Sequence, residues 1–216
     1  MTIEEYIETH SSPQPEGLAR LERESNLRML HGRMCSGHIQ GRLLKMLVCM
    51  LRPRRVLELG TFTGYSALCL AEGLRETGAD REVRLVTVEA NDELEDFLRR
   101  EFRENGYENI IELRIGDALT QMRQMESESI DLIFMDADKR QYAEYYVEAK
   151  RLLREGGFIV ADNTLWDGHV VEERKHDSQT EGILKFNKMV AEDEETEKVL
   201  LPLRDGLTII RKRNNG

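Results

Sequence analysis

The chain has 216 residues and a formal net charge of −10. This length fits one domain with a sizeable core. The acidic charge disfavours a general nucleic-acid binder, because attraction to phosphate needs a net basic face. Basic clusters at 52–55 and 211–213 leave a small structured RNA open as a partner.

Targeting and redox signals are missing from the sequence. No apolar run approaches the ~20 residues that a membrane span needs, and the acidic N-terminus does not resemble a signal peptide. Cys35, Cys49 and Cys69 are odd in number and lack CxxC spacing. We therefore expect reduced thiols and a cytoplasmic protein without a membrane partner.

Helices and strands alternate along most of the chain. Two helical segments open it, separated by Ser11-Ser12-Pro13, and a third helix is predicted over 38–51, which Pro53 ends. Strands are then predicted over 55–60, 83–89, 109–117, 130–136 and 158–162, and helices over 66–76, 92–105, 118–125 and 141–153. This alternation predicts a parallel sheet covered by helices on both faces.

The pattern changes after residue 163. A polar stretch over 167–181 is followed by a predicted helix over 182–191 and an acidic turn. Asp205-Gly206 is a turn signal between two apolar runs and predicts an antiparallel hairpin at the C-terminal end. We expect one domain over 1–216, with an N-terminal helical segment over 1–52 and a Rossmann-like core over 53–216.

Each predicted strand of the core ends in polar residues. These are, in chain order, Glu58 with Gly60, Glu89, Asp117, Asp136, and Asp162 with Asn163. The carboxyl ends of parallel strands share one edge of a sheet, and ligands bind there. Each residue alone would be an ordinary turn residue, but five such strand ends together favour a site.

The loop after the first strand limits the ligand. In ELGTFTGYS (58–66), Gly60 and Gly64 would let the backbone approach a ligand closely. Phe62 stands where a dinucleotide-binding loop needs a glycine beside the pyrophosphate, which disfavours an NAD-dependent oxidoreductase. Glu89 is placed to accept hydrogen bonds from ribose hydroxyls. Asp117 either binds the amine of adenine or caps the next helix.

Five stretches resemble a known family: VLELGTFTGYSAL, VEAND, GDAL, DLIFMDADKRQYAEYY and GGFIVADNTLWDG. They resemble the cation-dependent O-methyltransferases, which include caffeoyl-coenzyme A and catechol O-methyltransferases and many small bacterial relatives. The resemblance covers about residues 30–213. It implies an α/β fold with a seven-stranded, mostly parallel sheet and a C-terminal antiparallel hairpin. It also implies S-adenosylmethionine (SAM) as the cofactor, and a homodimer.

The same resemblance assigns roles to particular residues. The cofactor would be held by Met34, Glu58, Gly60, Tyr65, Ser66, Glu89, Asp117, Ala118 and Asp136. A divalent cation, Mg²⁺ or else Mn²⁺ or Ca²⁺, would be held by Asp136, Asp162 and Asn163. The catalytic residues would be Lys139, as the base, and Asp136.

The chemistry of these residues fits that assignment. Two carboxylates and an amide oxygen are hard ligands, which suit Mg²⁺, Mn²⁺ or Ca²⁺. A bound cation lowers the pKa of a phenol or catechol hydroxyl and directs its oxygen. A lysine near a helix N-terminus is mildly unfavourable, so Lys139 indicates a role as proton acceptor. Asp138 is interpreted as a helix cap rather than a ligand.

Other readings stay open at this stage. Trp166 either forms an aromatic wall beside the cation or packs in the core, while His169 and His176 are interpreted as loop residues. Tyr142, Tyr145 and Tyr146 are predicted to lie in the core. The segment 167–181 is interpreted as a mobile lid over the acceptor. Alternative functions are methylation of a hydroxylated tRNA nucleoside, an NAD-dependent oxidoreductase, and a non-catalytic SAM-binding protein.

Overall fold

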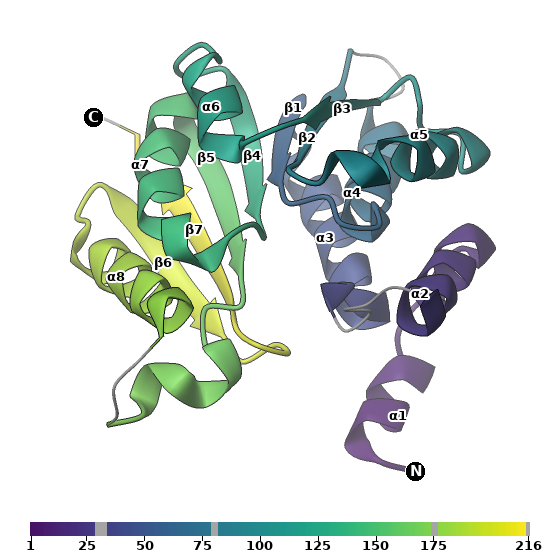
Figure 1. Ribbon diagram of the computed structural model, residues 1–216, viewed down its shortest axis with the longest axis horizontal. Coiled ribbons are helices and arrows are strands. Elements are labelled where there is room, and N and C mark those ends of the chain that lie inside the picture. Colours follow the sequence, from purple (N-terminus) through teal and green to yellow (C-terminus); the bar gives the residue numbers. More distant parts are fainter. Residues whose placement is uncertain (29–33, 79–81, 174–176, 215–216) are drawn as a thin grey trace. The chain divides into compact units, whose positions relative to one another are not determined.

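The computed structural model describes residues 1–28, 34–78, 82–173 and 177–214 (Figure 1). The α-helices are α1 (Ile3–Thr9), α2 (Glu16–Arg28), α3 (Gly37–Leu51), α4 (Tyr65–Thr77), α5 (Glu95–Glu104), α6 (Ala118–Arg123), α7 (Tyr142–Leu152) and α8 (Ser178–Glu192). The strands are β1 (Arg55–Leu59), β2 (Arg84–Glu89), β3 (Ile111–Ile115), β4 (Ile130–Met135), β5 (Leu153–Asp162), β6 (Thr196–Leu201) and β7 (Leu207–Lys212). Short 3-10 turns are η2 (Asp92–Leu94), η3 (Lys139–Gln141) and η4 (Trp166–Val171).

The strands form one seven-stranded sheet in the order β3-β2-β1-β4-β5-β7-β6. β1 pairs with β4, and β4 with β5, in parallel, whereas β7 pairs antiparallel with both β5 and β6. The predicted α/β class, the mostly parallel sheet and the C-terminal hairpin are therefore confirmed. No helix in the described ranges is both long and apolar enough to cross a bilayer.

The predicted starts of two elements lie well inside the observed ones. β5 begins at Leu153 rather than 158, because Leu153 pairs with Ile130 ahead of a bulge, after which Leu132 pairs with Phe158. α8 begins at Ser178 rather than 182, because the Asp177 side chain caps its first turn. Much of the predicted lid is therefore helical, in η4 and the start of α8, and residues 174–176 lie outside the described residues.

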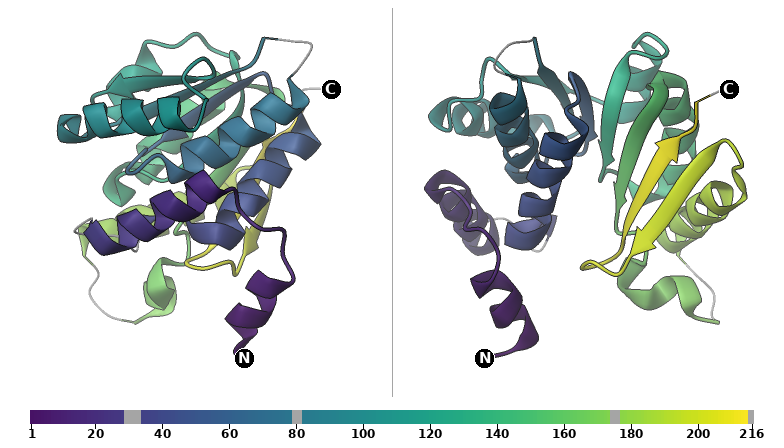
Figure 2. Two further views of the ribbon diagram at one scale, coloured as in Figure 1. Left: turned by 90° about the vertical axis from the view of Figure 1, so that its right-hand side faces the viewer. Right: turned by 180° about the vertical axis from the view of Figure 1, so that it is seen from behind.

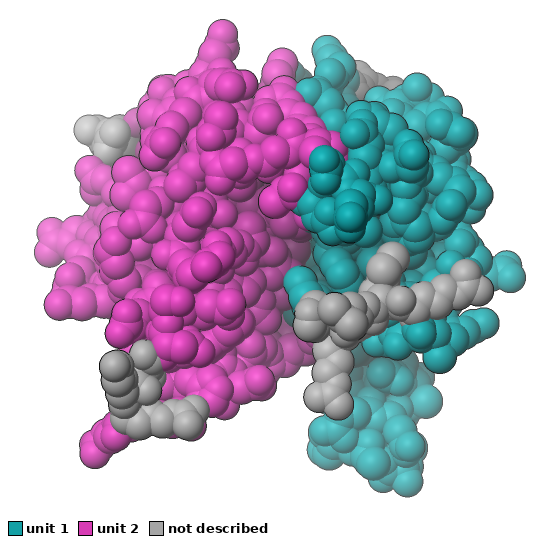
Figure 3. Space-filling model, in the orientation of Figure 1, with its two compact units in different colours: residues 1–54, 61–85, 91–113 teal, residues 55–60, 86–90, 114–216 magenta. Residues whose placement is uncertain are grey.

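Contacts divide the chain into two compact units (Figure 3). Unit 1 comprises residues 1–54, 61–85 and 91–113, and unit 2 comprises 55–60, 86–90 and 114–216. The expectation of one domain over 1–216 stays a prediction.

Unit 1 is built on the close packing of α3 against α4 (Figure 2). A Cβ on Gly73 would lie only 2.8 Å from the Cβ of Val48, so the two helices approach more closely than larger residues allow. Arg42 and Glu72 form a 2.6 Å ion pair between the same helices. Within this unit Arg20 of α2 also reaches the buried carboxylate of Glu101 on α5 at 2.8 Å.

Unit 2 holds a core on one face of its strands. Alternate residues of the strands, such as Leu57 and Leu59, or Ile133 and Met135, point to this face. α6, α7 and α8 cover it with buried residues that include Met122, Tyr142, Tyr145, Tyr146, Ile183 and Phe186. The tyrosines are therefore in the core, as predicted.

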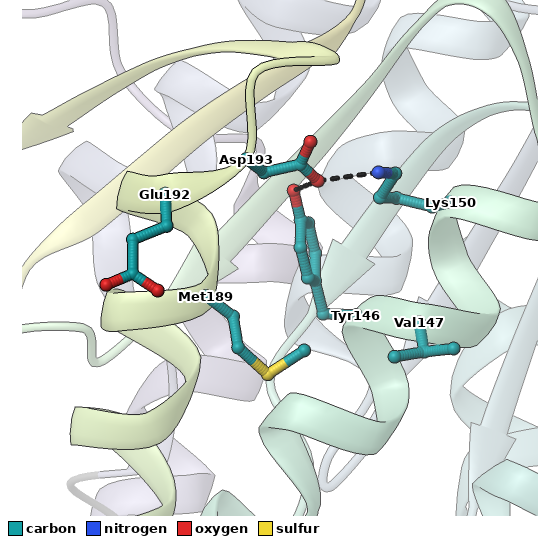
Figure 4. Close-up of a pocket in the computed structure, with 6 residues that line it drawn as sticks. All are labelled: Tyr146, Val147, Lys150, Met189, Glu192 and Asp193. Carbon is teal, nitrogen blue, oxygen red and sulfur yellow. Dashed lines mark hydrogen bonds and ion pairs between the residues drawn. The ribbon is translucent and has the colours of Figure 1, made fainter.

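A polar cluster joins α7 to the end of α8 beside a pocket of about 380 Å³ (Figure 4). The Asp193 carboxylate accepts hydrogen bonds from Tyr146 at 2.7 Å and from Lys150 at 2.6 Å. Lys150 also donates to Glu195 at 2.5 Å. Because these polar groups of the pocket bond one another, we interpret the cluster as a structural link between the helices.

The cluster predicts a pH-dependent stability. Burial acts to raise the pKa of Asp193, but the hydrogen bonds from Lys150 and Tyr146 outweigh it and hold the pKa below its ordinary value of 3.8. A lowered folded-state pKa gives a contribution that is complete above pH 3.8 and is lost as the pH falls through the folded-state value. Asp193→Asn should lower the free energy of unfolding at pH 7 by about 1–2 kcal/mol.

Urea unfolding at pH 7 and near pH 3 tests this, since the difference between wild type and Asp193→Asn should shrink at the lower pH. Glu192→Gln is the matched control. The Glu192 carboxylate is next in sequence to Asp193, but it is exposed, and its contact with Lys188 is long, at 3.9 Å. An Asp193→Asn deficit that is equal at both pH values would contradict the assignment.

Candidate functional site

The carboxyl ends of β4 and β5 bring two aspartates to adjacent positions in unit 2. Met135 pairs with Ala161, so Asp136 and Asp162 are the next residues at neighbouring strand ends. The Asp136 amide donates to the Leu59 carbonyl of β1 at 2.9 Å. Asp162 is only 4% exposed, and its carboxylate accepts the amide of Asn163 at 2.8 Å.

Lys139 is not a solvated surface lysine. It begins η3, where Asp138 caps the turn by accepting the Arg140 amide at 3.1 Å, as predicted. Lys139 is 9% exposed. Its Nζ donates to Asp136 Oδ1 at 2.6 Å and to the Tyr142 hydroxyl at 2.9 Å.

Tyr142 has a polar role that the sequence analysis missed. Its ring belongs to the core, but its hydroxyl lies 3.1 Å from the Met135 carbonyl oxygen and 3.0 Å from that of Asp162. Burial, followed by the charges of Asp136 and Asp162, raises the pKa of Tyr142 well above its ordinary value. The phenol is therefore neutral and lies between the two strand ends.

Asp205 is the second residue that the sequence analysis missed. Its carboxylate accepts the side-chain amide of Asn163 at 3.2 Å and the backbone amide of Asp167. Burial, reinforced by the charges of Asp167 and Asp162, raises the pKa of Asp205. The sequence suggested only a turn at this position. The antiparallel pairing of β7 with β5 places Leu207 opposite Asp162, which brings the preceding turn to the site.

The turn before β7 supports a strained loop after β5. Asn163, Trp166 and Asp167 have left-handed φ values of 59°, 48° and 49°. Such values cost of the order of 1–3 kcal/mol at residues with side chains, and they gather at functional sites. The Leu165 amide also donates to the Asp205 carbonyl at 2.8 Å. The loop that carries Asn163 is therefore fixed by the turn at Asp205.

The donor set fits a hard divalent cation. Asp136 and Asp162 offer carboxylate oxygens, and the side-chain nitrogen of Asn163 donates to Asp205, which leaves the side-chain oxygen as the atom that would bind a cation. Over the described ranges, no group of His, Cys, Asp and Glu alone forms a metal-binding cluster. The candidate therefore rests on two carboxylates and one amide oxygen, which suit Mg²⁺, Mn²⁺ or Ca²⁺.

Four of the predicted cofactor residues in unit 2 lie at strand ends or beside them. Glu58 is fully buried and accepts the Thr87 hydroxyl at 2.5 Å. Glu89 ends β2 and is 9% exposed. Asp117 caps α6 through the Thr120 amide at 2.8 Å, and the bonds from Thr120 lower its pKa. The following residue, Ala118, is buried.

The remaining predicted cofactor residues occupy different settings. In unit 1, Met34 is 57% exposed, Ser66 is buried, and the buried Tyr65 donates to Gln14 at 2.5 Å. Gly60, in unit 2, has φ +89°, and a Cβ there would collide with the backbone of Asp136.

The two loop glycines make room for protein atoms. A Cβ on Gly64 would lie 2.7 Å from the Phe102 ring. Together with the contact of Gly60 to Asp136, this gives both glycines a reason in protein packing, and the close approach of a ligand stays a prediction. The binding role of Gly60 stays a prediction.

The residues after β5 have ordinary partners. Trp166 is partly buried against the core of unit 2, which matches its packing interpretation. His169 lies in η4 and contacts Glu172 at 2.9 Å. His176 lies outside the described residues.

Comparisons with known proteins all point to one enzyme family. The model of the O-methyltransferase family matches residues 8–213. The chain is 32% identical to a catechol O-methyltransferase of Niastella koreensis, over 76% of this chain and 73% of the relative. It is also 32% identical to caffeoyl-CoA O-methyltransferase 1 of Eucalyptus globulus, over 95% of this chain and 86% of the relative.

Two solved structures with bound cofactor or product are similar. The SAH-bound methyltransferase PaMTH1 of Podospora anserina is 28% identical with a TM-score of 0.88, covering 98% of this chain and 94% of that chain. The O-methyltransferase TomG of Streptomyces achromogenes, in complex with SAM, is 26% identical with a TM-score of 0.87, covering 99% and 100%.

The support of the loop by Asp205 can be tested by local opening. In Asp205→Ala the Asp167 amide loses its carboxylate acceptor, so its hydrogen exchange should be at least about tenfold faster, the equivalent of about 1.4 kcal/mol. Glu194→Ala, which removes an exposed carboxylate from another turn, is the control. Exchange at Asp167 that is as slow in Asp205→Ala as in the control would show that the carboxylate does not hold the loop.

Proposed function

This chain belongs to the family of SAM-dependent O-methyltransferases, and we propose that it methylates a hydroxyl of a small catechol-like or other phenolic molecule with the help of a divalent cation. The observation that carries the proposal is the pairing of Asp136 with Asp162 at adjacent strand ends, beside Asn163 and Lys139. The relatives named for catechol and caffeoyl-CoA support an acceptor of this class.

The cation would be held by Asp136, Asp162 and Asn163. When bound, it supplies positive charge that lowers the pKa of an acceptor hydroxyl and fixes the direction of its oxygen. Asp136, Asp162 and Asp205 all act on Tyr142, so negative charge gathers at this edge of unit 2. In the structure, the Lys139 side chain brings positive charge to Asp136. A carboxylate cluster of this kind favours a further positive charge.

The protein side chains have separate tasks in this proposal. Lys139 lies 2.6 Å from Asp136 and, in its neutral form, would take the proton of the acceptor hydroxyl. Asp205 holds the amide of Asn163, which keeps its oxygen directed to the cation. Glu89 accepts hydrogen bonds from the ribose hydroxyls of the cofactor. The other cofactor contacts are those predicted from the sequence, at Met34, Glu58, Gly60, Tyr65, Ser66, Asp117, Ala118 and Asp136.

Methylation of a tRNA nucleoside is the weaker alternative. Two residues of the basic 211–213 cluster are engaged within unit 2: Arg211 pairs with Glu197 at 3.0 Å, and Lys212 donates to the Leu153 carbonyl at 2.8 Å. Membership of the O-methyltransferase family argues against the other two alternatives, an NAD-dependent oxidoreductase and a non-catalytic SAM-binding protein. We further infer that the protein is cytoplasmic and that it forms a homodimer. Sedimentation of the purified protein would test the homodimer.

Two variants should separate cation binding from cofactor binding. Chelator should abolish methyl transfer from SAM to a catechol panel by the wild type, and Mg²⁺, Mn²⁺ or Ca²⁺ should restore it. Asp162→Ala should lose this response yet bind S-adenosylhomocysteine normally in calorimetry. Glu89→Ala should retain Mn²⁺ binding but lose at least about tenfold in S-adenosylhomocysteine affinity, the equivalent of one charged hydrogen bond.

Total RNA assayed under the same conditions distinguishes the tRNA alternative.

Full turnover of any acceptor in chelator would reject the cation. Loss of S-adenosylhomocysteine binding in Asp162→Ala, with unchanged binding in Glu89→Ala, would reverse the assigned roles.

A further inference from the structure

The hydroxyl of Tyr142 is not needed for packing of the core. The ring is fully buried, and Phe186 packs edge-on against it at 5.4 Å. A phenylalanine would fill the same apolar volume. A buried hydroxyl costs free energy unless it is hydrogen-bonded, and this one meets Lys139 Nζ and the carbonyl oxygens of Met135 and Asp162.

The direction of these hydrogen bonds follows from counting protons. A neutral phenol has one proton and can also accept. The two carbonyl oxygens can only accept, so the phenol proton goes to one of them. The phenol oxygen therefore accepts from Lys139, at 2.9 Å. Asp136 Oδ1, at 2.6 Å, also accepts from the same nitrogen.

We propose that Tyr142 is a positioning residue that, together with Asp136, fixes the position of Lys139 Nζ so that it faces the acceptor. Two hydrogen bonds to groups on different elements leave the end of this long side chain little freedom to move. This inference rests on the proposed function, since it assigns Lys139 the acceptor's proton.

The backbone at Lys139 packs closely against α8. A Cβ on Gly182 of α8 would meet the Lys139 carbonyl oxygen and would lie 2.8 Å from the Cα of Arg140. α8 therefore closes directly onto η3. The turn cannot shift toward α8, and Tyr142 holds the end of the lysine side chain. Positioning of this kind affects rate steeply, because a displacement of about 1 Å at a reacting group can cost about 100-fold.

Tyr146 provides a matched control on the same helix. It is also buried, packs edge-on against Phe186 at 5.7 Å, and donates from its hydroxyl to Asp193 rather than to the site (Figure 4). Tyr142→Phe and Tyr146→Phe each remove one buried hydroxyl from α7. A general loosening of the core would affect both variants, whereas positioning of Lys139 would be affected only by Tyr142→Phe.

The test combines kinetics with chemical labelling of Lys139. With saturating Mg²⁺, Tyr142→Phe should lower kcat by about 10- to 100-fold with KM for acceptor and SAM changed less than about twofold. Tyr146→Phe should keep the wild-type kcat. In the metal-free protein without substrate, mass spectrometry should show faster reductive methylation of Lys139 in Tyr142→Phe, with the exposed Lys185 and Lys188 as internal references.

The labelling arm is independent of the proposed function. Lys139 reactivity that is unchanged in Tyr142→Phe would overturn the positioning role, even if no acceptor were found. An equal fall of kcat in both variants would also overturn it, because the effect would then belong to the core. Absence of methyl transfer by the wild type would reject the proposed function alone.

Discussion

Clustered negative charge at the ends of β4 and β5 is the constraint on which the site depends. Parallel pairing of Met135 with Ala161 sets Asp136 beside Asp162, and Asp205 adds a third carboxylate whose pKa is raised. Like charges held together destabilise a fold unless a cation or hydrogen bonds offset them. Lys139 offsets part of this charge at Asp136. We propose that a divalent cation offsets the remainder.

The surrounding structure keeps these groups at fixed positions. The neutral Tyr142 bridges both strand ends, the turn at Asp205 holds the left-handed backbone of Asn163, and Gly182 admits α8 against η3. Apart from that of Tyr142 with Met135, these contacts join segments that are distant in sequence. Left-handed backbone and neighbouring carboxylates therefore meet at one edge of unit 2, where we propose that the cation binds.

Much of this could be predicted from sequence because the signals are local. Strand ends, the cap at Asp138 and the Asp205-Gly206 turn follow from alternation and turn chemistry, and the motif around Asp136 indicated the family. The support from Asp205 and the hydroxyl role of Tyr142 were missed, because both arise from tertiary contacts across 42 and 20 residues. The early start of β5 depends on a bulge against β4, and the glycines at 60 and 64 serve protein packing that spacing alone does not reveal.

Anomalous X-ray diffraction from crystals grown with Mn²⁺ and S-adenosylhomocysteine tests the proposed cation site most directly. We predict one strong peak within about 2.4 Å of oxygens from Asp136, Asp162 and Asn163, with Lys139 Nζ still in contact with Tyr142. A crystal with no peak at these strand ends, or with Mn²⁺ bound only by other side chains, would contradict it.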